Sequence, residues 1–110
     1  MSALWDGEAF RRRMLTLEQN AENYAREHRE RLRRGQGNGS AFERDRSSGE
    51  AFAYGSLASS AATERRSTLQ AKLQGMLAKP PTPRENMDAD AWTTGFVAVV
   101  RSLLAEVREG

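Results

Sequence analysis

The spacing of apolar residues in the first third of the chain predicts one long amphipathic helix. From Phe10 onward, apolar or seam residues recur at alternating intervals of four and three positions, which places them on one helix face. Asp6 is a suitable N-cap, and Trp5 and Phe10 have the spacing of a hydrophobic staple around it. Gly35 directly follows two arginines, as is typical of a helix C-terminus. We therefore expect a helix over residues 6–34. Its coiled-coil-like stripe consists of Phe10, Met14, Leu17, Ala21, Tyr24 and His28.

The middle of the chain predicts a loop followed by a helix rich in small residues. Residues 35–47 combine closely spaced glycines with charged residues, a composition typical of loops. Ser47 and Glu50 have the spacing of a capping box, which predicts a helix over residues 48–78, ending just before three prolines. Its alanines and glycines favour close packing against another backbone. A pair of arginines interrupts its apolar face, so one bent helix and two helices with a break near Thr63 both fit the pattern.

The last third of the chain predicts a stiff linker and a further helix. Residues 79–87 contain the three prolines, and Asp88 is a suitable cap for a helix over residues 89–108. The apolar face of this helix is wider than contact with one neighbouring helix requires, which predicts a central position in the fold. That face consists of Trp92, Phe96, Val99, Val100, Leu103, Leu104 and Val107.

Together these patterns predict a single all-α domain over residues 1–110, a length suited to one domain. No segment alternates apolar and polar residues for long enough to indicate a strand. The expected architecture is an irregular bundle with the long N-terminal helix in an antiparallel helical hairpin. It contains three helices, or four if the middle segment is broken.

The apolar content indicates that the chain needs a partner to complete its core. Only 38% of the residues are hydrophobic and none is Ile. Narrow apolar stripes bury little area against roughly 1–2 kcal/mol of backbone entropy per ordered residue. We therefore expect a protein partner or a further copy of the chain to cover part of these stripes. The expected partner-binding residues are Trp5, Phe10, Met14, Leu17, Tyr24, Trp92 and Phe96.

Few residues are suited to catalysis or to metal binding. The chain has no Cys and a single His, His28, which lies on the helical stripe and is explained by a seam position. Gly35, Gly37 and Gly39 lack both the preceding strand and the following Lys-Ser or Lys-Thr pair of a phosphate-binding loop. The acidic residues fit helix starts and ion pairs at four-residue spacing. We therefore expect no enzyme activity, no metal and no cofactor.

Arginine suggests an alternative, charged partner. The net charge is only +2, but 15 of the 17 basic residues are Arg, whose planar forks match phosphates and carboxylates. Interleaved glutamates neutralise about half of this local charge, which weakens the case for a dedicated nucleic-acid binder. The candidate nucleic-acid contacts are Arg26, Arg29, Arg33, Arg34, Arg44 and Arg46.

The leading hypothesis from the sequence is a non-catalytic structural or adaptor protein that assembles through its helices, with itself or within a larger complex. The alternative is a small Arg-rich regulator that binds nucleic acid. The longest apolar run, residues 96–100, is far shorter than the roughly 20 residues of a membrane span. The first ten residues lack the apolar run of a signal peptide. Together with the absence of Cys, these features favour a cytoplasmic protein without a membrane partner.

Overall fold

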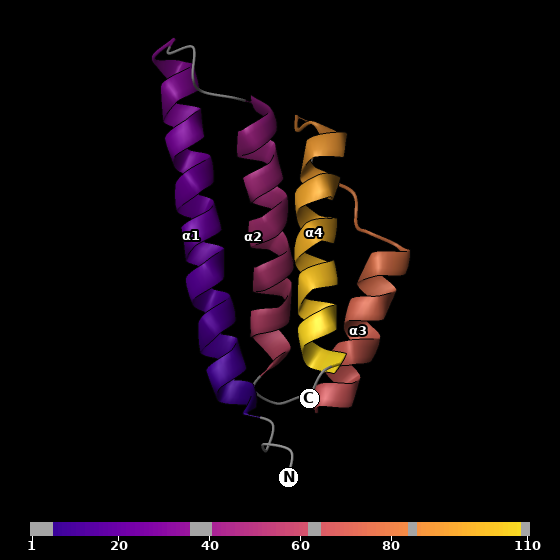
Figure 1. Ribbon diagram of the computed structural model, residues 1–110. Coiled ribbons are helices and arrows are strands. Elements are labelled where there is room, and N and C mark those ends of the chain that lie inside the picture. Colours follow the sequence, from indigo (N-terminus) through magenta and orange to yellow (C-terminus); the bar gives the residue numbers. More distant parts are fainter. Residues whose placement is uncertain (1–5, 36–40, 62–64, 84–85, 109–110) are drawn as a thin grey trace.

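The computed structural model describes residues 6–35, 41–61, 65–83 and 86–108, and these residues form four helices and no strand (Figure 1). The all-α fold class is therefore confirmed, as is the helical bundle. The middle segment contains two helices, one ending at Ala61 and the next beginning at Arg66, and the expected break near Thr63 lies outside the described residues. The four helices are α1 (Gly7–Arg33), α2 (Ala41–Ala61), α3 (Arg66–Ala78) and α4 (Ala89–Arg108).

Both ends of α1 follow from local capping. The carboxylate of Asp6 accepts a hydrogen bond of 2.9 Å from the backbone N–H of Ala9, which satisfies one of the free donors of the first turn. Gly35 has a φ of +71°, the left-handed conformation that ends many helices and that glycine adopts without strain. The expected bounds of this helix are confirmed to within one residue at each end.

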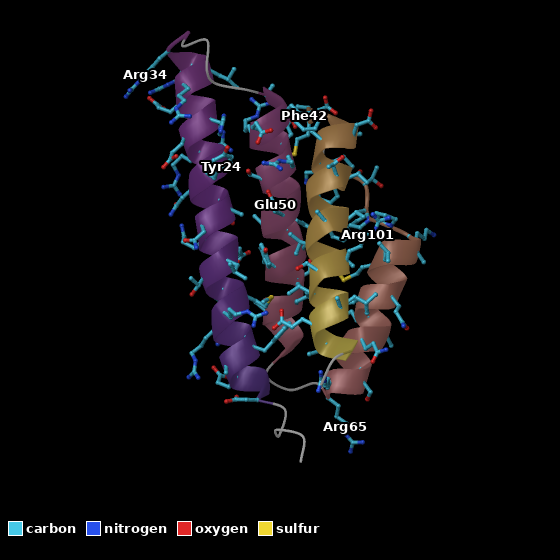
Figure 2. The ribbon with its side chains drawn as sticks, in the orientation of Figure 1. Tyr24, Arg34, Phe42, Glu50, Arg65 and Arg101 are labelled. Carbon is cyan, nitrogen blue, oxygen red and sulfur yellow. The ribbon has the colours of Figure 1, made fainter. Side chains whose placement is uncertain are left out.

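The buried face of α1 differs from the expected stripe at one position. Phe10, Met14 and His28 are buried as expected, but Tyr24 is 40% exposed and Ala25 is buried in its place. Tyr24 is labelled on α1 in Figure 2. A straight helix has 3.6 residues per turn, so a seam with a period of 3.5 drifts around the helix by about 20° per heptad. Over the two heptads from Phe10 to Tyr24 this drift amounts to about 40°, which places Tyr24 towards the edge of the buried face.

The expected loop over residues 35–47 is wrong in its second half, because α2 already begins at Ala41. Ser47, the expected cap, is buried inside the helix. The charged residues of the first turns gave this segment the composition of a loop. In the helix, their carboxylates form local and tertiary contacts. Glu43 pairs with Arg46 at 2.6 Å. Asp45 is buried and accepts a hydrogen bond of 2.9 Å from the backbone N–H of Asp88, 43 residues away.

The helices lie side by side in the order α1, α2, α4, α3 (Figure 1), and the most extensive contacts join neighbours in this row. α1 and α2 are antiparallel, whereas α2 and α4 run in the same direction (Figure 1). The radius of gyration is 15.1 Å, compared with about 13 Å for a compact domain of this length. The row therefore leaves α1 at one edge, with a neighbouring helix on one side.

α4 lies between α2 and α3, in agreement with its wide apolar face. Its predicted apolar residues are all buried, together with Leu69 and Leu73 of α3. Arg66, at the start of α3, donates hydrogen bonds to the backbone carbonyls of Val107 and Glu106 in the last turn of α4. These carbonyls have no partner within their own helix, so Arg66 caps α4 from outside.

α2 and α4 cross in direct backbone contact at two glycines. A Cβ added to Gly49 would lie 2.0 Å from the carbonyl oxygen of Trp92, and a Cβ added to Gly95 would lie 2.0 Å from that of Arg46. Each glycine thus admits the backbone of the other helix. This contact confirms the expectation that small residues of the middle segment allow close approach of another backbone.

Candidate functional site

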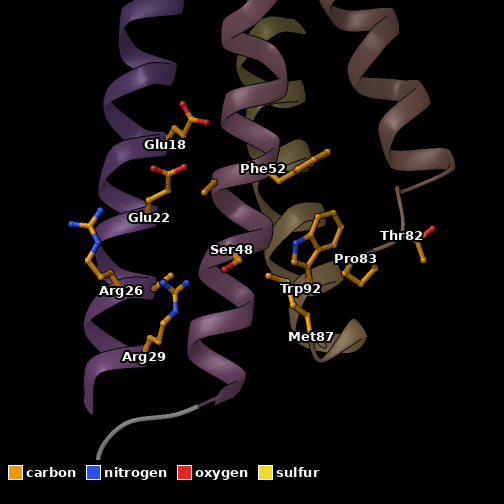
Figure 3. A pocket seen from close by; sticks show the side chains of 12 residues that line it. Glu18, Glu22, Arg26, Arg29, Ser48, Phe52, Thr82, Pro83, Met87 and Trp92 are labelled. Carbon is orange, nitrogen blue, oxygen red and sulfur yellow. The ribbon is translucent and has the colours of Figure 1, made fainter. Parts of the chain in front are cut away.

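A surface cavity of about 490 Å³ lies where α1, α2 and the start of α4 meet (Figure 3). We call it the Phe52 groove. One wall is formed by α1, and the other side is formed by α2, the proline segment and α4. The charged residues of the α1 wall are Glu18, Glu22, Arg26 and Arg29, and the large apolar residues opposite are Phe52, Pro83, Met87 and Trp92.

Phe52 connects the groove to the hydrophobic core. Its side chain is 49% exposed, although its ring centroid lies 5.4 Å from that of Trp92 and 6.1 Å from that of Phe96. Trp92 and Phe96 are buried and stack with an interplanar angle of 8°. Buried neighbours thus support one face of Phe52 and leave part of its ring open to the groove. An aromatic side chain in such a position is typical of binding surfaces.

The α1 wall carries its charges in a fixed order. Glu18 and Glu22 lie along one half of the groove and Arg26 and Arg29 along the other (Figure 3). Within the part of the chain that the structure describes, none of these four side chains forms an ion pair. Burial raises the pKa of Glu18 above its ordinary value, and the charge of Glu22 raises this pKa further. The groove thus presents an acidic half and a basic half to a ligand.

Asp45 positions the apolar side of the groove. Burial by itself raises the pKa of Asp45. Hydrogen bonds from Arg44 and from the backbone N–H of Asp88, together with the charges of Arg44 and Arg29, outweigh this effect and lower the pKa overall. The ionised carboxylate therefore anchors the start of α4. Asp88 in turn accepts a hydrogen bond of 3.0 Å from the N–H of Ala91, as expected for an N-cap.

A smaller hollow of about 310 Å³ lies on the other flank of α1, between α1 and α2. Tyr24, Glu50 and Tyr54 are among its lining residues. Burial raises the pKa of Glu50, and the nearby charge of Glu43 adds to this effect while that of Arg46 opposes it. Tyr24 also contacts a buried ring, that of His28, with ring centroids 4.5 Å apart. The hollow is smaller than the Phe52 groove, however, so we regard the Phe52 groove as the stronger candidate.

The predicted partner-binding residues mostly contribute to the protein's own core. Phe10, Met14, Trp92 and Phe96 are buried, Leu17 is partly buried, and Trp5 lies outside the described residues. Their binding to a partner stays a prediction. Tyr24 is the one predicted residue with an exposed side chain among those described, and the other exposed aromatic side chains there are Phe42 and Phe52, which sequence reasoning missed. Phe42 fell in the expected loop, and Phe52 is surrounded in sequence by alanines that indicated only close packing.

The structure separates the six candidate nucleic-acid contacts into two groups. Four of them pair with carboxylates of the same chain: Arg33 and Arg34 with Glu30, Arg44 with Asp45, and Arg46 with Glu43. The remaining two, Arg26 and Arg29, line the Phe52 groove beside two glutamates. These pairs neutralise part of the positive charge of the six guanidinium groups, and their contact with nucleic acid stays a prediction.

The described residues offer neither a metal site nor a membrane-spanning helix. They contain no group of three or more His, Cys, Asp or Glu side chains that could hold a metal ion. None of their helices combines the length and the hydropathy needed to cross a membrane.

No family model, no curated protein and no solved structure matches this chain.

Proposed function

We propose that this protein is a non-catalytic helical assembly protein that binds an amphipathic helix in the Phe52 groove. The observation that carries this proposal is Phe52, a half-exposed aromatic ring supported by Trp92 and Phe96 at the side of a concave, charged surface. Residues that dominate protein interfaces are commonly aromatic, lie in well-packed pockets and have charged or polar residues around them.

The shape and the charge of the groove both favour a helix as the ligand. Two long antiparallel helices flank its length, and a third helix packs between such neighbours by placing its apolar side chains over the groove floor. The ligand helix would present basic residues to Glu18 and Glu22 and acidic residues to Arg26 and Arg29. The centres of these two pairs are seven to eight positions apart, or about 11 Å along α1.

The proposal includes no enzyme activity. A cytoplasmic location stays a prediction that fractionation of the source cells would check. We do not extend the proposal to nucleic acid, because most of the candidate arginines already pair with carboxylates of the chain.

A synthetic helix tests the proposal directly. The probe is an amphipathic peptide with a leucine stripe and with a Lys pair and a Glu pair spaced to face the acidic and basic halves of the groove. Trp92 serves as the fluorescent reporter in a Trp5→Phe background, because Trp92 lines the groove. We expect a saturable change in emission, and we expect Phe52→Arg to weaken binding at least tenfold, or about 1.4 kcal/mol.

Phe42→Arg provides the matched control. Phe42 is 44% exposed and also lies on α2, but it does not line the groove. The control should bind the peptide as the parent does, and a peptide with the Lys and Glu pairs exchanged should bind less tightly. Equal affinities for the two Phe→Arg variants, or no binding of either peptide to the parent, would refute the proposal.

A further inference from the structure

α1 carries a second seam beside the one that packs on α2. The residues of this seam recur at intervals of three and four positions, the spacing of a coiled-coil seam. Four of them line the Phe52 groove, and Leu15 extends the seam with a side chain that is 39% exposed. The second seam consists of Leu15, Glu18, Glu22, Ala25, Arg29 and Leu32. Ala25 is buried within the protomer and the other five are at least partly exposed, so these five are the residues open to a second copy.

When the second seams of two copies run antiparallel, apolar residues face apolar residues and acidic residues face basic ones. In an antiparallel pair of identical helices centred between residues 23 and 24, Leu15 of one helix lies opposite Leu32 of the other. Glu18 then lies opposite Arg29, and Glu22 lies next to Ala25 and Arg26. A parallel pair would instead place each glutamate opposite the same glutamate, which is unfavourable.

We propose that the helix bound in the Phe52 groove is α1 of a second copy of this chain, antiparallel to the first. This inference rests on the proposed function and names its partner. The two copies form a two-fold symmetric dimer in which each groove receives the α1 helix of the other copy. Residues 15–32 span about 26 Å, or nearly five helical turns, so the contact extends well beyond the groove at both ends.

The arrangement of the fold makes this contact accessible. The Phe52 groove is a surface cavity, and extensive contacts of α1 are made with α2, so a second α1 can approach the groove without displacing another helix of the row (Figure 1). The extended radius of gyration of 15.1 Å is consistent with a protomer that packs against another chain. Phe52 of each copy lies in the same groove and is then covered by α1 of the other copy, which removes its exposed ring from water.

Two charge variants test both the contact and its direction. In the first, E18R/E22R, the charged residues of the groove wall are all Arg, and in the second, R26E/R29E, they are all Glu. Each variant alone places like charges opposite one another, so we expect its dimer to dissociate at least about 50-fold more readily than the parent dimer. An equimolar mixture of the two should form a heterodimer, because every position then meets the opposite charge.

Sedimentation equilibrium of the parent, each variant and the mixture measures these states. The quadruple variant that combines both pairs of changes is the internal control, because it restores opposite charges and should again form a homodimer. A parent that stays monomeric up to 100 μM would overturn the inference, as would variants that self-associate like the parent. Because the mixture must recover association, misfolding of a single variant cannot be mistaken for support.

Disulfide formation checks the register. The chain has no cysteine, so a single introduced Cys reports on one position. Two residues at position 22 would be about 4.5 Å apart along the helix axis, whereas residue 27 lies on the opposite side of α1 from the seam. We expect Glu22→Cys to form a cross-linked dimer under mild oxidation and Glu27→Cys, an exposed control, to remain uncross-linked. Equal cross-linking at both positions would contradict the register.

The inference and the proposed function can fail separately. If the parent is monomeric but binds the synthetic helix through Phe52, the Phe52 groove is a helix-binding site, and a second copy of the chain is not its ligand. A monomeric parent that binds no helix would remove both.

Discussion

Gly95 is the position at which a single methyl group should disrupt the bundle. A Cβ there would lie 2.0 Å from the carbonyl oxygen of Arg46 and 2.9 Å from its carbonyl carbon. Both are backbone atoms of α2, which cannot rotate away as a side chain would. To restore an ordinary contact of 3.4 Å, α2 and α4 would have to separate locally by about 1.4 Å.

The expected magnitude combines two opposing effects. Overpacking of a well-packed contact costs about 1–3 kcal/mol, and the rigid backbone partner places this site at or above the upper limit. Alanine is a better helix former than glycine by about 1 kcal/mol, which offsets part of the loss. We therefore expect Gly95→Ala to lower the free energy of unfolding by about 2 kcal/mol or more. For a chain of this length, that corresponds to a decrease in Tm of about 8 °C.

Gly75→Ala is the matched control. Gly75 is also a helical glycine, in α3, but a Cβ added there would have no neighbouring atom within 4 Å. Only the gain in helix propensity remains, so this variant should be more stable than the parent by about 0.5–1 kcal/mol. Urea denaturation followed by circular dichroism measures both variants, at one protein concentration because association would also change stability.

The opposite signs of the two effects make the test decisive. If Gly95→Ala were as stable as the parent, or stabilised like Gly75→Ala, the close backbone crossing of α2 and α4 would be wrong. Gly49→Ala tests the same crossing from the other helix, where the Cβ would meet the carbonyl oxygen of Trp92 at 2.0 Å.

Three further predictions concern the ends of helices. The folded-state pKa of Asp45 is lowered, so its stabilising contribution is complete above the unfolded value of about 3.9 and disappears as the pH falls through the lower folded value. The unfolding free energy of the parent, measured by urea titration, should therefore fall more steeply below pH 4 than that of Asp45→Asn. Parallel pH profiles of the two proteins would contradict the role of the carboxylate. Arg66→Met should cost about 1–2 kcal/mol in the same assay, because the carbonyl of Val107 loses a charged donor; an unchanged midpoint would remove this cap. Gly35→Ala should cost about 1 kcal/mol although the surrounding space is open, because its φ of +71° strains any residue with a Cβ; a stabilised variant would show that this turn can rearrange.

The amino-acid sequence was sufficient where structure depends on neighbours along the chain. Asp6 and Asp88 bind backbone N–H groups three residues away, so the starts of α1 and α4 could be predicted from residue type and spacing alone. The same is true of the end of α1 at Gly35. The wide apolar face of α4 likewise predicted its burial, because periodicity shows which side of a helix avoids water.

The tertiary structure decided the features that depend on distant partners. α2 starts at Ala41 rather than near residue 48, and within these first turns Asp45 caps a helix 43 residues further on, a partner that no local pattern reveals. Gly49 is distinguished from Gly75 only by the backbone that crosses it. Phe52 appeared to be one more apolar residue of a small-residue helix, and its half-exposed ring follows from where Trp92 and α1 lie. Local hydrogen bonds set where helices begin and end, whereas the packing of whole helices sets which side chains remain open to a partner.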